Sequence, residues 1–524
     1  MAQQMAQQSA GGAVVKQTLG LTGATVNAMA LIAPGAFLWI TYQLQAAATA
    51  PNGSSVAADI WPGIVAALIL AFLTAISYAE LARVYPEAGF GSCYYFAEKA
   101  FLDRESTKHH QWARLAKIVT GWAAHLFYWV YPGVMVAMMA TMIGYIYTQF
   151  TGATLSNTAL VVVAVVFAFV TGYVAFRGIT GSTMTALLIN IIQLVTLVLF
   201  SALAIYYRWT NPQGATQWAF SGGWDVILPH SLTGVIVQST LAILILVGFE
   251  SCTALAAETK NPSRNIPRAV VLSLVIQGLF AYLFEYFAAG YMINEKLVAT
   301  VTEGTKTSTV TGMAAAAASS APIGDMAVLV GNSVLGGIGF GLMISIAVTV
   351  AIAIFGTTLS CLNTAVRVSY AMAQDREMPE ILGVLHGRFA TPHRALWVLV
   401  VVSCLIGAVG VQSVVGLTGI ALASNFGTVM LYGLTCLWAL IAFPGRAEYS
   451  FFKHGLVPVL GLLANVLMLV AIIYLYFIGN ADSQKEAYIC FAIAGAWAIV
   501  SAIYVAVGGR RSGRTLVGRP ERAS

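Results

Sequence analysis

The sequence predicts an all-α polytopic membrane protein with twelve transmembrane helices. Three observations predict it: an apolar composition, twelve apolar stretches of spanning length and a one-sided distribution of basic residues. Of the 524 residues, 59% are hydrophobic and only 9% are charged, and the mean hydropathy is +0.81. Soluble domains carry roughly 25% charged residues, so this chain has more apolar surface than one water-soluble core of its length can bury.

Each apolar stretch is long enough for a spanning helix, which needs about 20 mostly apolar residues. Everything that spans is expected to be helical, because backbone groups in lipid must pair internally. The predicted stretches are Leu21–Ala46, Trp61–Ala82, Ile118–Phe150, Ala159–Phe176, Ser182–Tyr207, Leu232–Ala257, Arg268–Tyr291, Val334–Tyr370, Ala395–Val411, Val414–Phe443, Leu456–Ile478 and Tyr488–Val507. The loop Asn294–Met326 is too polar to span, and its alanine run predicts a short surface helix.

The basic residues predict the orientation. With twelve spans and the N-terminus inside, 22 of the 26 Lys and Arg residues fall on the cytoplasmic side and 4 fall outside. Positive residues accumulate in cytoplasmic loops, so this bias predicts a multi-pass protein of the cell (inner or cytoplasmic) membrane with both termini cytoplasmic. The net charge of +6 therefore gives no argument for nucleic acid, because it lies in short loops and in the C-terminal tail.

Two of the predicted helices carry a discontinuity. In the first, Ile32–Phe37 places Pro34 beside Gly35; proline removes a backbone donor, and glycine lets the chain leave helical geometry. In the sixth, Gly248 interrupts the run Val247–Phe249. A plain proline kink is the alternative for the first helix. If helices 1–5 and 6–10 form inverted repeats, a pairing inferred from spacing alone, the two breaks correspond, which is the pattern of a transporter site.

Glu250 follows the second break directly. An acid at bilayer depth costs several kcal/mol, about 3 on insertion scales, and by default marks a functional site. No Lys or Arg lies in the middle of any predicted helix, so no obvious partner exists. Three interpretations stay open: a proton-titrating switch, a counter-charge for a cationic substrate, or a structural carboxylate bonded to N–H groups that the break frees. The missing partner favours proton coupling or a substrate cation over a permanent ion pair.

Two breaks at mid-membrane also predict a receptor for an α-amino acid. Half-helices expose unpaired N–H groups at one break and C=O groups at another. The N–H end suits a carboxylate, and the carbonyl end suits an ammonium group or another cation. Because a zwitterionic amino acid carries both charges on one carbon, such a site needs no charged side chain.

Three stretches resemble the amino acid–polyamine–organocation (APC) transporters. Residues Tyr78–Tyr95, YAELARVYPEAGFGSCYY, are similar to the family's loop after helix 2. Gly248–Ala269 resembles its helix 6 and the exit from it, with GFE, a later Glu258, KNP and IPRA. Arg367–Asp375, RVSYAMAQD, resembles its segment after helix 8. The twelve-helix layout extends this resemblance across the chain.

The resemblance implies a LeuT-like 5+5 inverted repeat plus two C-terminal helices. The domains are then a cytoplasmic N-terminal tail (1–18), a transport core (19–443), helices 11 and 12 (444–508) and a basic cytoplasmic tail (509–524). It also places the substrate at the two breaks and at aromatic residues of helix 3, for which packing is the alternative. The predicted substrate-binding residues are Ile32, Ala33, Pro34, Gly35, Tyr128, Tyr131, Leu244, Val247, Gly248 and Phe249, with Glu250 for proton coupling.

The sequence also departs from the family. Leu244 stands where arginine and polyamine exchangers carry an aromatic gate, which weakens the argument for a cation stacked on a ring. Gln193 falls near the position where several members carry a lysine that fills a sodium site. Thr357 and Thr358 are then candidates for the metal, as part of a sodium site. The alternative for these threonines is a hydrogen bond to a carbonyl of their own helix.

Charged residues at the predicted cytoplasmic helix ends indicate a gate of ion pairs, with a solvated face as the alternative. They are Glu80, Arg83, Glu87, Glu258 and Arg367. A further acid, Glu285, lies inside the seventh stretch, and the alternative to an intramembrane role is solvation near the surface.

The predicted function is secondary active transport of amino acids or related amines by alternating access, as a permease or exchanger. Its predicted partners are a small-molecule substrate, the lipid bilayer and either H⁺, Na⁺ or a counter-substrate. Proton coupling or antiport leads, and a sodium-coupled symporter or a membrane solute sensor is the alternative. An enzyme is not expected, because no metalloprotease motif or nucleophile elbow is present. No cofactor is expected either, and the six cysteines show no metal spacing.

Overall fold

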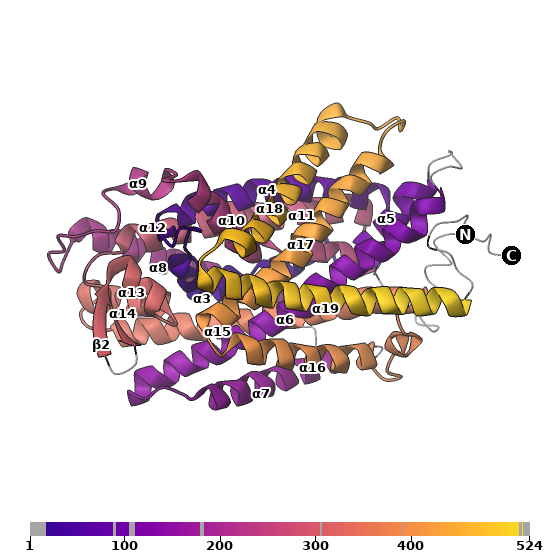
Figure 1. Ribbon diagram of the computed structural model, residues 1–524. Coiled ribbons are helices and arrows are strands. Elements are labelled where there is room, and N and C mark those ends of the chain that lie inside the picture. The colour runs from indigo at the N-terminus through magenta and orange to yellow at the C-terminus, as the bar shows by residue number, and fades with distance from the viewer. Residues whose placement is uncertain are drawn as a thin grey trace.

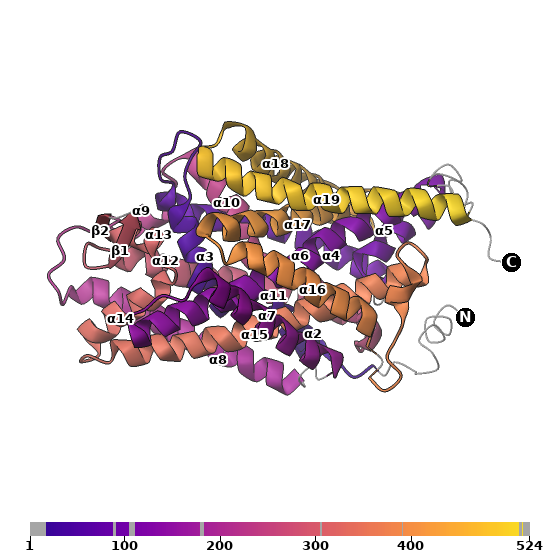
Figure 2. The ribbon, with the colours of Figure 1, turned by 60° about the horizontal axis from the view of Figure 1, so that its bottom comes forward.

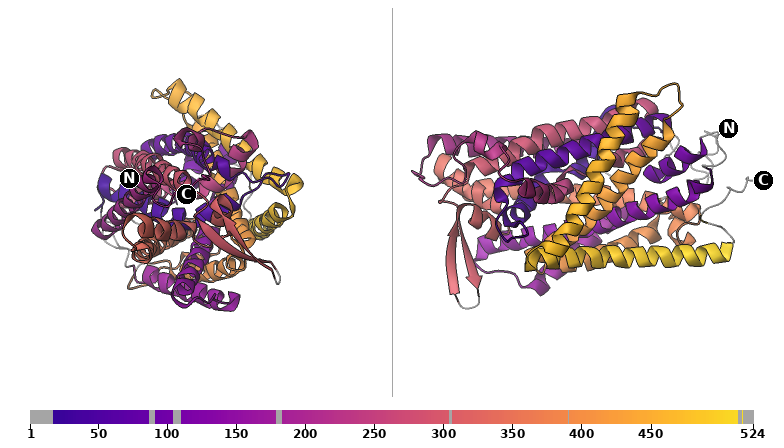
Figure 3. Two further views of the ribbon diagram at one scale, coloured as in Figure 1. Left: turned by 90° about the vertical axis from the view of Figure 1, so that its left-hand side faces the viewer. Right: turned by 45° about the horizontal axis from the view of Figure 1, so that its top comes forward.

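The computed structural model describes residues 17–86, 91–103, 110–178, 183–303, 306–389, 391–512 and 516. Its long helices run along a common axis (Figure 1). The strands β1 (Val298–Glu303) and β2 (Lys306–Thr311) project from one end of this bundle (Figure 3), which we call the hairpin end. Helix α5 (Cys93–Leu102) lies at the opposite end, the α5 end.

The helices before the hairpin cover the first seven predicted spans. They are α2 (Leu21–Ile32), α3 (Pro34–Ala47), η1 (Ala57–Asp59), α4 (Ile60–Val84), α5, η3 (His110–Trp112), α6 (Ala113–Thr151), α7 (Asn157–Phe176), α8 (Thr183–Thr210), α9 (Gly223–Ile227), α10 (Leu232–Leu246), η4 (Phe249–Glu258), α11 (Pro262–Leu274), η5 (Val275–Tyr282) and α12 (Leu283–Met292). η4 is a 3-10 helix and η5 a π-helix, and η5 joins α11 to α12 without interruption.

The helices after the hairpin cover the remaining five. They are α13 (Gly312–Ala318), α14 (Pro322–Val334), α15 (Gly339–Gln374), η6 (Glu380–Gly383), α16 (His393–Gly410), α17 (Val414–Ala442), η7 (Phe451–Leu456), α18 (Val457–Ile478) and α19 (Ala481–Ser512). Helices α18 and α19 run along the outside of the bundle (Figure 2).

Eleven helices in the described part of the chain are long and apolar enough to cross a membrane. They correspond to predicted spans 2 to 12. The first predicted span is divided into α2 and α3, with 12 and 14 residues, and neither half is long enough alone. The structure is thus an all-α polytopic membrane protein with one small two-stranded sheet.

The burial of these helices separates a core from a periphery. In the most apolar part of α6, 89% of the residues are buried inside the protein, whereas the corresponding figure for α19 is 11%. Helix α6 packs against α15, α16 and α17, so it is the central helix. Helices such as α19 expose large apolar side chains over their length, which is the pattern of a surface that faces lipid rather than water.

The loop between the seventh and eighth predicted spans is more ordered than expected. Its alanine run forms the short helix α13, as predicted. The hairpin before it was not predicted: β1 and β2 pair antiparallel, from Val298 opposite Thr311 to Glu303 opposite Lys306. Threonine alternates with alanine and valine in β1 and with serine and valine in β2, and this alternation is the signal that indicates a strand pair.

Candidate functional site: two broken helices and a buried carboxylate

The first predicted interruption is present and lies at Ala33. This residue has φ +33°, in the left-handed region that non-glycine residues rarely adopt. It ends α2, and Pro34 begins α3. Proline suits the first position of a helix because the N–H group that it lacks would be unpaired there. The end of α2 leaves its last carbonyl groups without helical donors.

Hydroxyl groups from three other helices satisfy these carbonyl groups. The donors come from α15, α6 and η5, so three separate elements meet at the break. The hydrogen bonds are Thr357 Oγ1 to Ala30 O (2.9 Å), Tyr131 Oη to Leu31 O (3.4 Å) and Tyr282 Oη to Ile32 O (2.7 Å). The first break is therefore lined by polar groups in an otherwise apolar core.

The second predicted interruption is also present. Helix α10 ends at Leu246, Val247 is extended, and Gly248 has φ +123°, a conformation that favours glycine. A Cβ atom on Gly248 would lie 2.7 Å from Leu31 Cβ, closer than two such carbons can approach. The two breaks are thus in direct contact, and only a glycine fits between them.

Glu250 lies at this contact with its carboxylate fully bonded. The side chain is 1% exposed. Tyr128 Oη donates to Oε1 at 3.1 Å, and Tyr432 Oη donates to Oε2 at 2.7 Å. The backbone N–H of Gly248, which the break frees, donates to Oε2 at 3.0 Å. Three donors of this kind stabilise an ionised carboxylate, so in this conformation the geometry matches the structural-carboxylate interpretation of Glu250.

An aromatic cluster covers the carboxylate. The ring centroids of Phe249 and Tyr432 are 5.1 Å apart, and Tyr78 lies 6.0–6.1 Å from both in edge-to-face arrangements. Such pairs favour fixed ring orientations. All three rings are buried, so water is excluded from this side of the site.

The structure brings together most of the predicted site residues. Tyr128 and Tyr131 both reach the breaks, through hydrogen bonds to Glu250 and Leu31 O; their predicted contact with substrate stays a prediction. Leu244 is buried in α10, before the second break. The buried residues around the two breaks are Ile32, Ala33, Tyr128, Tyr131, Leu244, Val247, Phe249 and Glu250, while Pro34 and Gly35 form the first turn of α3.

The two threonines proposed for a sodium site are bonded differently. Thr358 Oγ1 donates to Ile354 O of its own helix at 2.7 Å, the alternative that the sequence left open. Thr357 Oγ1 instead donates to Ala30 O in α2. The two hydroxyls therefore serve different carbonyl groups in this conformation, and a shared metal site stays a prediction.

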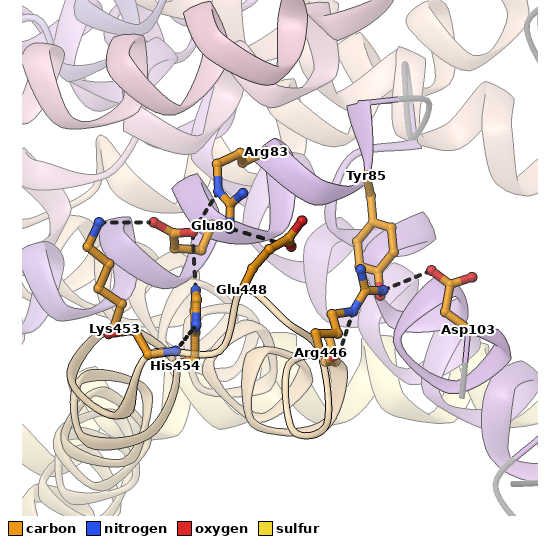
Figure 4. Close-up of polar contacts among 10 residues, drawn as sticks. Glu80, Arg83, Tyr85, Asp103, Arg446, Glu448, Lys453 and His454 are labelled. Carbon is orange, nitrogen blue, oxygen red and sulfur yellow. Dashed lines mark hydrogen bonds and ion pairs between the residues drawn. The ribbon is translucent and has the colours of Figure 1, made fainter. Parts of the chain in front are cut away.

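Charged side chains cluster at the α5 end, where the gate was predicted (Figure 4). Arg83 Nε lies 2.8 Å from Glu80 Oε2. His454 lies 3.2 Å from the same carboxylate and stacks on Phe443, with ring centroids 3.9 Å apart. Because Ser450 N–H donates to His454 Nδ1 at 2.9 Å, the hydrogen of this imidazole is on Nε2, which faces Glu80. This cluster joins α4 to η7.

Two further ion pairs join other helices at the same end. Arg367 of α15 lies 2.7 Å from Glu258 at the exit of η4, as the gate hypothesis requires, whereas Glu87 lies outside the described residues. Lys117 of α6 lies 2.5 Å from Asp375. Burial and the neighbouring Asp375 carboxylate raise the pKa of Tyr94 in α5, so its phenol stays protonated and donates to Asp375 at 3.0 Å.

Two residues of the site were missed in the sequence. Tyr282 and Tyr432 contact the breaks from positions 250 and 182 residues away along the chain. A tyrosine inside an apolar stretch is the only signal that each offers, and many buried tyrosines share it. His454 at the α5 end was missed for the same reason, since its partner Glu80 lies 374 residues away.

Comparisons with known proteins place this geometry in a family. A family model described as amino acid permease matches residues 17–506. The chain is 23% identical to the methylthioribose transporter of Bacillus subtilis (strain 168) over 79% of this chain and 81% of that protein. It is 24% identical to the branched-chain amino acid permease of the same organism, over 71% and 72%.

A shorter match is to the low-affinity putrescine importer of Escherichia coli (strain K12), with 26% identity over 43% of this chain and 45% of that protein. The family model covers nearly the whole chain, including both broken helices and both helices after α17. The chain therefore belongs to the amino acid permease family of the APC transporters.

Proposed function

We propose that this protein is a secondary active transporter of α-amino acids that works by alternating access, with its substrate at the two broken helices. The observation that carries this proposal is the contact between the breaks: Gly248 lies against Leu31, and hydroxyls from α6, η5 and α15 hold the freed carbonyl groups. A substrate ammonium group could replace these hydroxyls as the donor, so that each freed carbonyl group would keep a hydrogen bond.

The architecture that we propose is the LeuT-like one. Helix 1 is α2 with α3, helix 6 is α10 with η4, and α18 and α19 follow the ten helices of the repeats. The bias of basic residues supports a cytoplasmic α5 end and an external hairpin end.

Cysteine labelling tests this orientation: a probe at Ser308 in β2 should react from outside, and one at Ser512 only after permeabilisation. Labelling of both positions from the same side would contradict the orientation.

The substrate class follows from the charges at the breaks. A diamine needs two anionic partners, and among the described residues that contact the breaks the carboxylate is Glu250, whose oxygens already accept three hydrogen bonds. A zwitterion needs only backbone carbonyls and the N–H groups at the start of α3. We therefore expect the substrate to be a neutral amino acid rather than putrescine or methylthioribose. The branched-chain amino acids named for one relative are examples of such substrates.

For Glu250 we propose a coupling role that depends on conformation. Its donors come from α6, α17 and the break itself. If helix 6 moves during transport, the Glu250 carboxylate loses hydrogen-bond donors. An ionised carboxylate without donors in an apolar interior is strongly disfavoured. Proton uptake would then accompany the movement. A sodium-coupled mechanism that uses Thr357 and Thr358 is the second candidate, supported by the reach of Thr357 to Ala30 O.

Counterflow in proteoliposomes tests the function. Vesicles loaded with unlabelled leucine should accumulate external radiolabelled leucine transiently, and vesicles loaded with putrescine should do so less. Saturable leucine binding without counterflow would instead favour a sensor. The absence of both for every amino acid and amine tried would reject the proposed substrate class.

Bulky substitutions at the breaks locate the site. Gly35→Leu and Gly248→Leu should abolish counterflow, since a side chain would stand between backbone groups and ligand. Gly495→Ala is the matched control, because a Cβ there meets no atom within 4 Å. All three variants are compared by size-exclusion profile, and leucine counterflow at the wild-type rate in both leucine variants would place the substrate elsewhere.

A further inference from the structure

A second buried carboxyl group lies outside the site described above. Glu285 is in α12, and its side chain is 0% exposed, so solvation at the surface does not describe this conformation. Within the described part of the chain, neither Oε1 nor Oε2 has a hydrogen-bond partner. Nothing in the transport scheme above uses this group.

Glu285 lies on a line of polar side chains between α8 and the seventh predicted helix. Gln277 Nε2 donates to Asn190 Oδ1 at 2.9 Å, and Asn294 Nδ2 donates to Tyr207 Oη at 3.2 Å. Both pairs are 87 residues apart, so α8 runs parallel to the segment from η5 to Asn294. Glu285 lies between these two pairs along the chain, in α12, which packs against α8.

The side chains along this line supply oxygen atoms without donors. Ser201 Oγ, Gln193 Oε1 and Gln277 Oε1 are buried and have no partner among the described residues. We call Asn190, Gln193, Ser201, Gln277 and Glu285 the polar seam. All five are 0–1% exposed, although much of the rest of α8 is exposed. Buried polar atoms without a partner are costly in an apolar interior, and four of these five residues carry at least one such atom in the described structure.

Among the described residues of the elements packed against α12, no cation pairs with the Glu285 carboxyl group. The phenols of Tyr282 and Tyr286 are its titratable neighbours, and they bond to Ile32 O and to Thr41 Oγ1. On α8, Arg208 bonds to carbonyl groups of Phe220, Ser221 and Tyr291. Asp59 before α4 bonds to the N–H groups of His230 and Ser231, and Asp225 of α9 faces His230.

An ionised carboxylate with no partner is strongly disfavoured in an apolar interior, and a bound proton removes the charge. We propose that Glu285 is a proton-binding site of the transport cycle, separate from Glu250. In this conformation Glu285 holds a proton. When the helices move apart, Glu285 exchanges this proton with water along the polar seam. This inference rests on the proposed transport function. Tyr282, three residues before Glu285, holds the first break, so movement of that break displaces Glu285 as well.

Infrared difference spectroscopy of the purified full-length protein tests the bound proton without any substrate. The wild-type spectrum minus that of Glu285→Gln should contain the C=O band of a protonated carboxyl group at neutral pH. Glu295→Gln is the matched control: the N–H group of Thr216 lowers the pKa of Glu295, so its difference spectrum should contain a carboxylate band. A carboxylate band for Glu285→Gln would overturn the proposal.

A second measurement needs no variant. A hydrophobic carbodiimide reacts with protonated carboxyl groups buried in membranes, so the wild-type peptide with Glu285 should be modified at acidic pH and less at alkaline pH. If Glu285→Gln does not fold, the carbodiimide result alone decides whether Glu285 binds a proton. The bound proton is rejected if Glu285 is not modified, or is modified equally at every pH, while exposed carboxyl groups react normally.

A transport measurement tests the coupling. In proteoliposomes with a luminal pH dye, the number of protons moved per leucine should fall in Glu285→Gln, where the titration of Glu250 remains, while leucine counterflow persists. Proton movement at the wild-type rate would overturn the coupling role. If the wild-type protein shows no counterflow, the proposed function fails, whereas the infrared result still decides whether Glu285 binds a proton.

Discussion

Glu250 and Glu285 are two buried carboxyl groups in opposite surroundings. Glu250 accepts hydrogen bonds from two tyrosines and one backbone N–H group, whereas Glu285 has no partner in the described structure. Both are at most 1% exposed. The difference teaches that burial alone does not decide what an acid inside a membrane does: its donors decide whether it can hold a charge in a given conformation.

The largest expected difference between the two is in stability. Glu250→Leu leaves three buried donors unpaired and should destabilise the protein by about 3 kcal/mol or more. Glu285→Met removes a carboxyl group without partners and nearly keeps the side-chain volume. It should therefore lower the free energy of unfolding by no more than about 1 kcal/mol, or increase it. Thermal unfolding in detergent, followed by tryptophan fluorescence, measures both. Equal destabilisation by the two variants would remove the contrast.

The second expected difference is in the pH dependence of leucine uptake. Glu250→Gln and Glu285→Gln each mimic a permanently protonated carboxyl, so each should remove one titration from the wild-type profile and flatten it, while exchange is retained. Uptake that varies about tenfold over the wild-type range should then vary only a few-fold. A flattened profile in Glu250→Gln alone would place coupling on Glu250 and reject the role of Glu285.

A separate result for Glu250→Gln would identify charge recognition. If exchange of neutral amino acids survives and only that of cationic substrates is lost, Glu250 binds a substrate cation rather than a coupling proton. Glu285→Gln is the matched variant here, because it lies away from the breaks and should not distinguish substrates by charge.

The sequence predicts local features of this molecule well and distant contacts poorly. Both helix breaks follow from proline and glycine at fixed positions, and their dihedral angles at Ala33 and Gly248 agree. Glu250 and Glu285 look alike in sequence, as single acids in apolar stretches. Their difference depends on Tyr128 and Tyr432, which approach Glu250 from helices 122 and 182 residues away. No local pattern carries that information.

The charged cluster at the α5 end shows the same limit in a milder form. Arg83 and Glu80 are three residues apart on one helix, so their pairing is predictable from helical spacing. The approach of His454 to Glu80 depends on how η7 packs against α4 and was not predicted. The hairpin β1–β2 is hard to predict for another reason, because alternation among polar residues in a loop is a weak signal.

The smallest expected difference is between two hydroxyl groups. Tyr432→Phe removes one of three donors to Glu250, so two remain and the carboxylate stays supported. Tyr282→Phe removes the bond to Ile32 O that links the first break to the helix of Glu285.

A single hydrogen bond contributes about 1 kcal/mol, or about fivefold in an equilibrium. We expect Tyr282→Phe to shift the apparent affinity for leucine by about this factor without changing the pH profile, and Tyr432→Phe to shift the pH profile with little effect on affinity. Leucine counterflow measured across pH for both variants distinguishes the two roles. The opposite assignment would mean that Glu250, and not the carbonyl groups of the first break, contributes most to substrate binding.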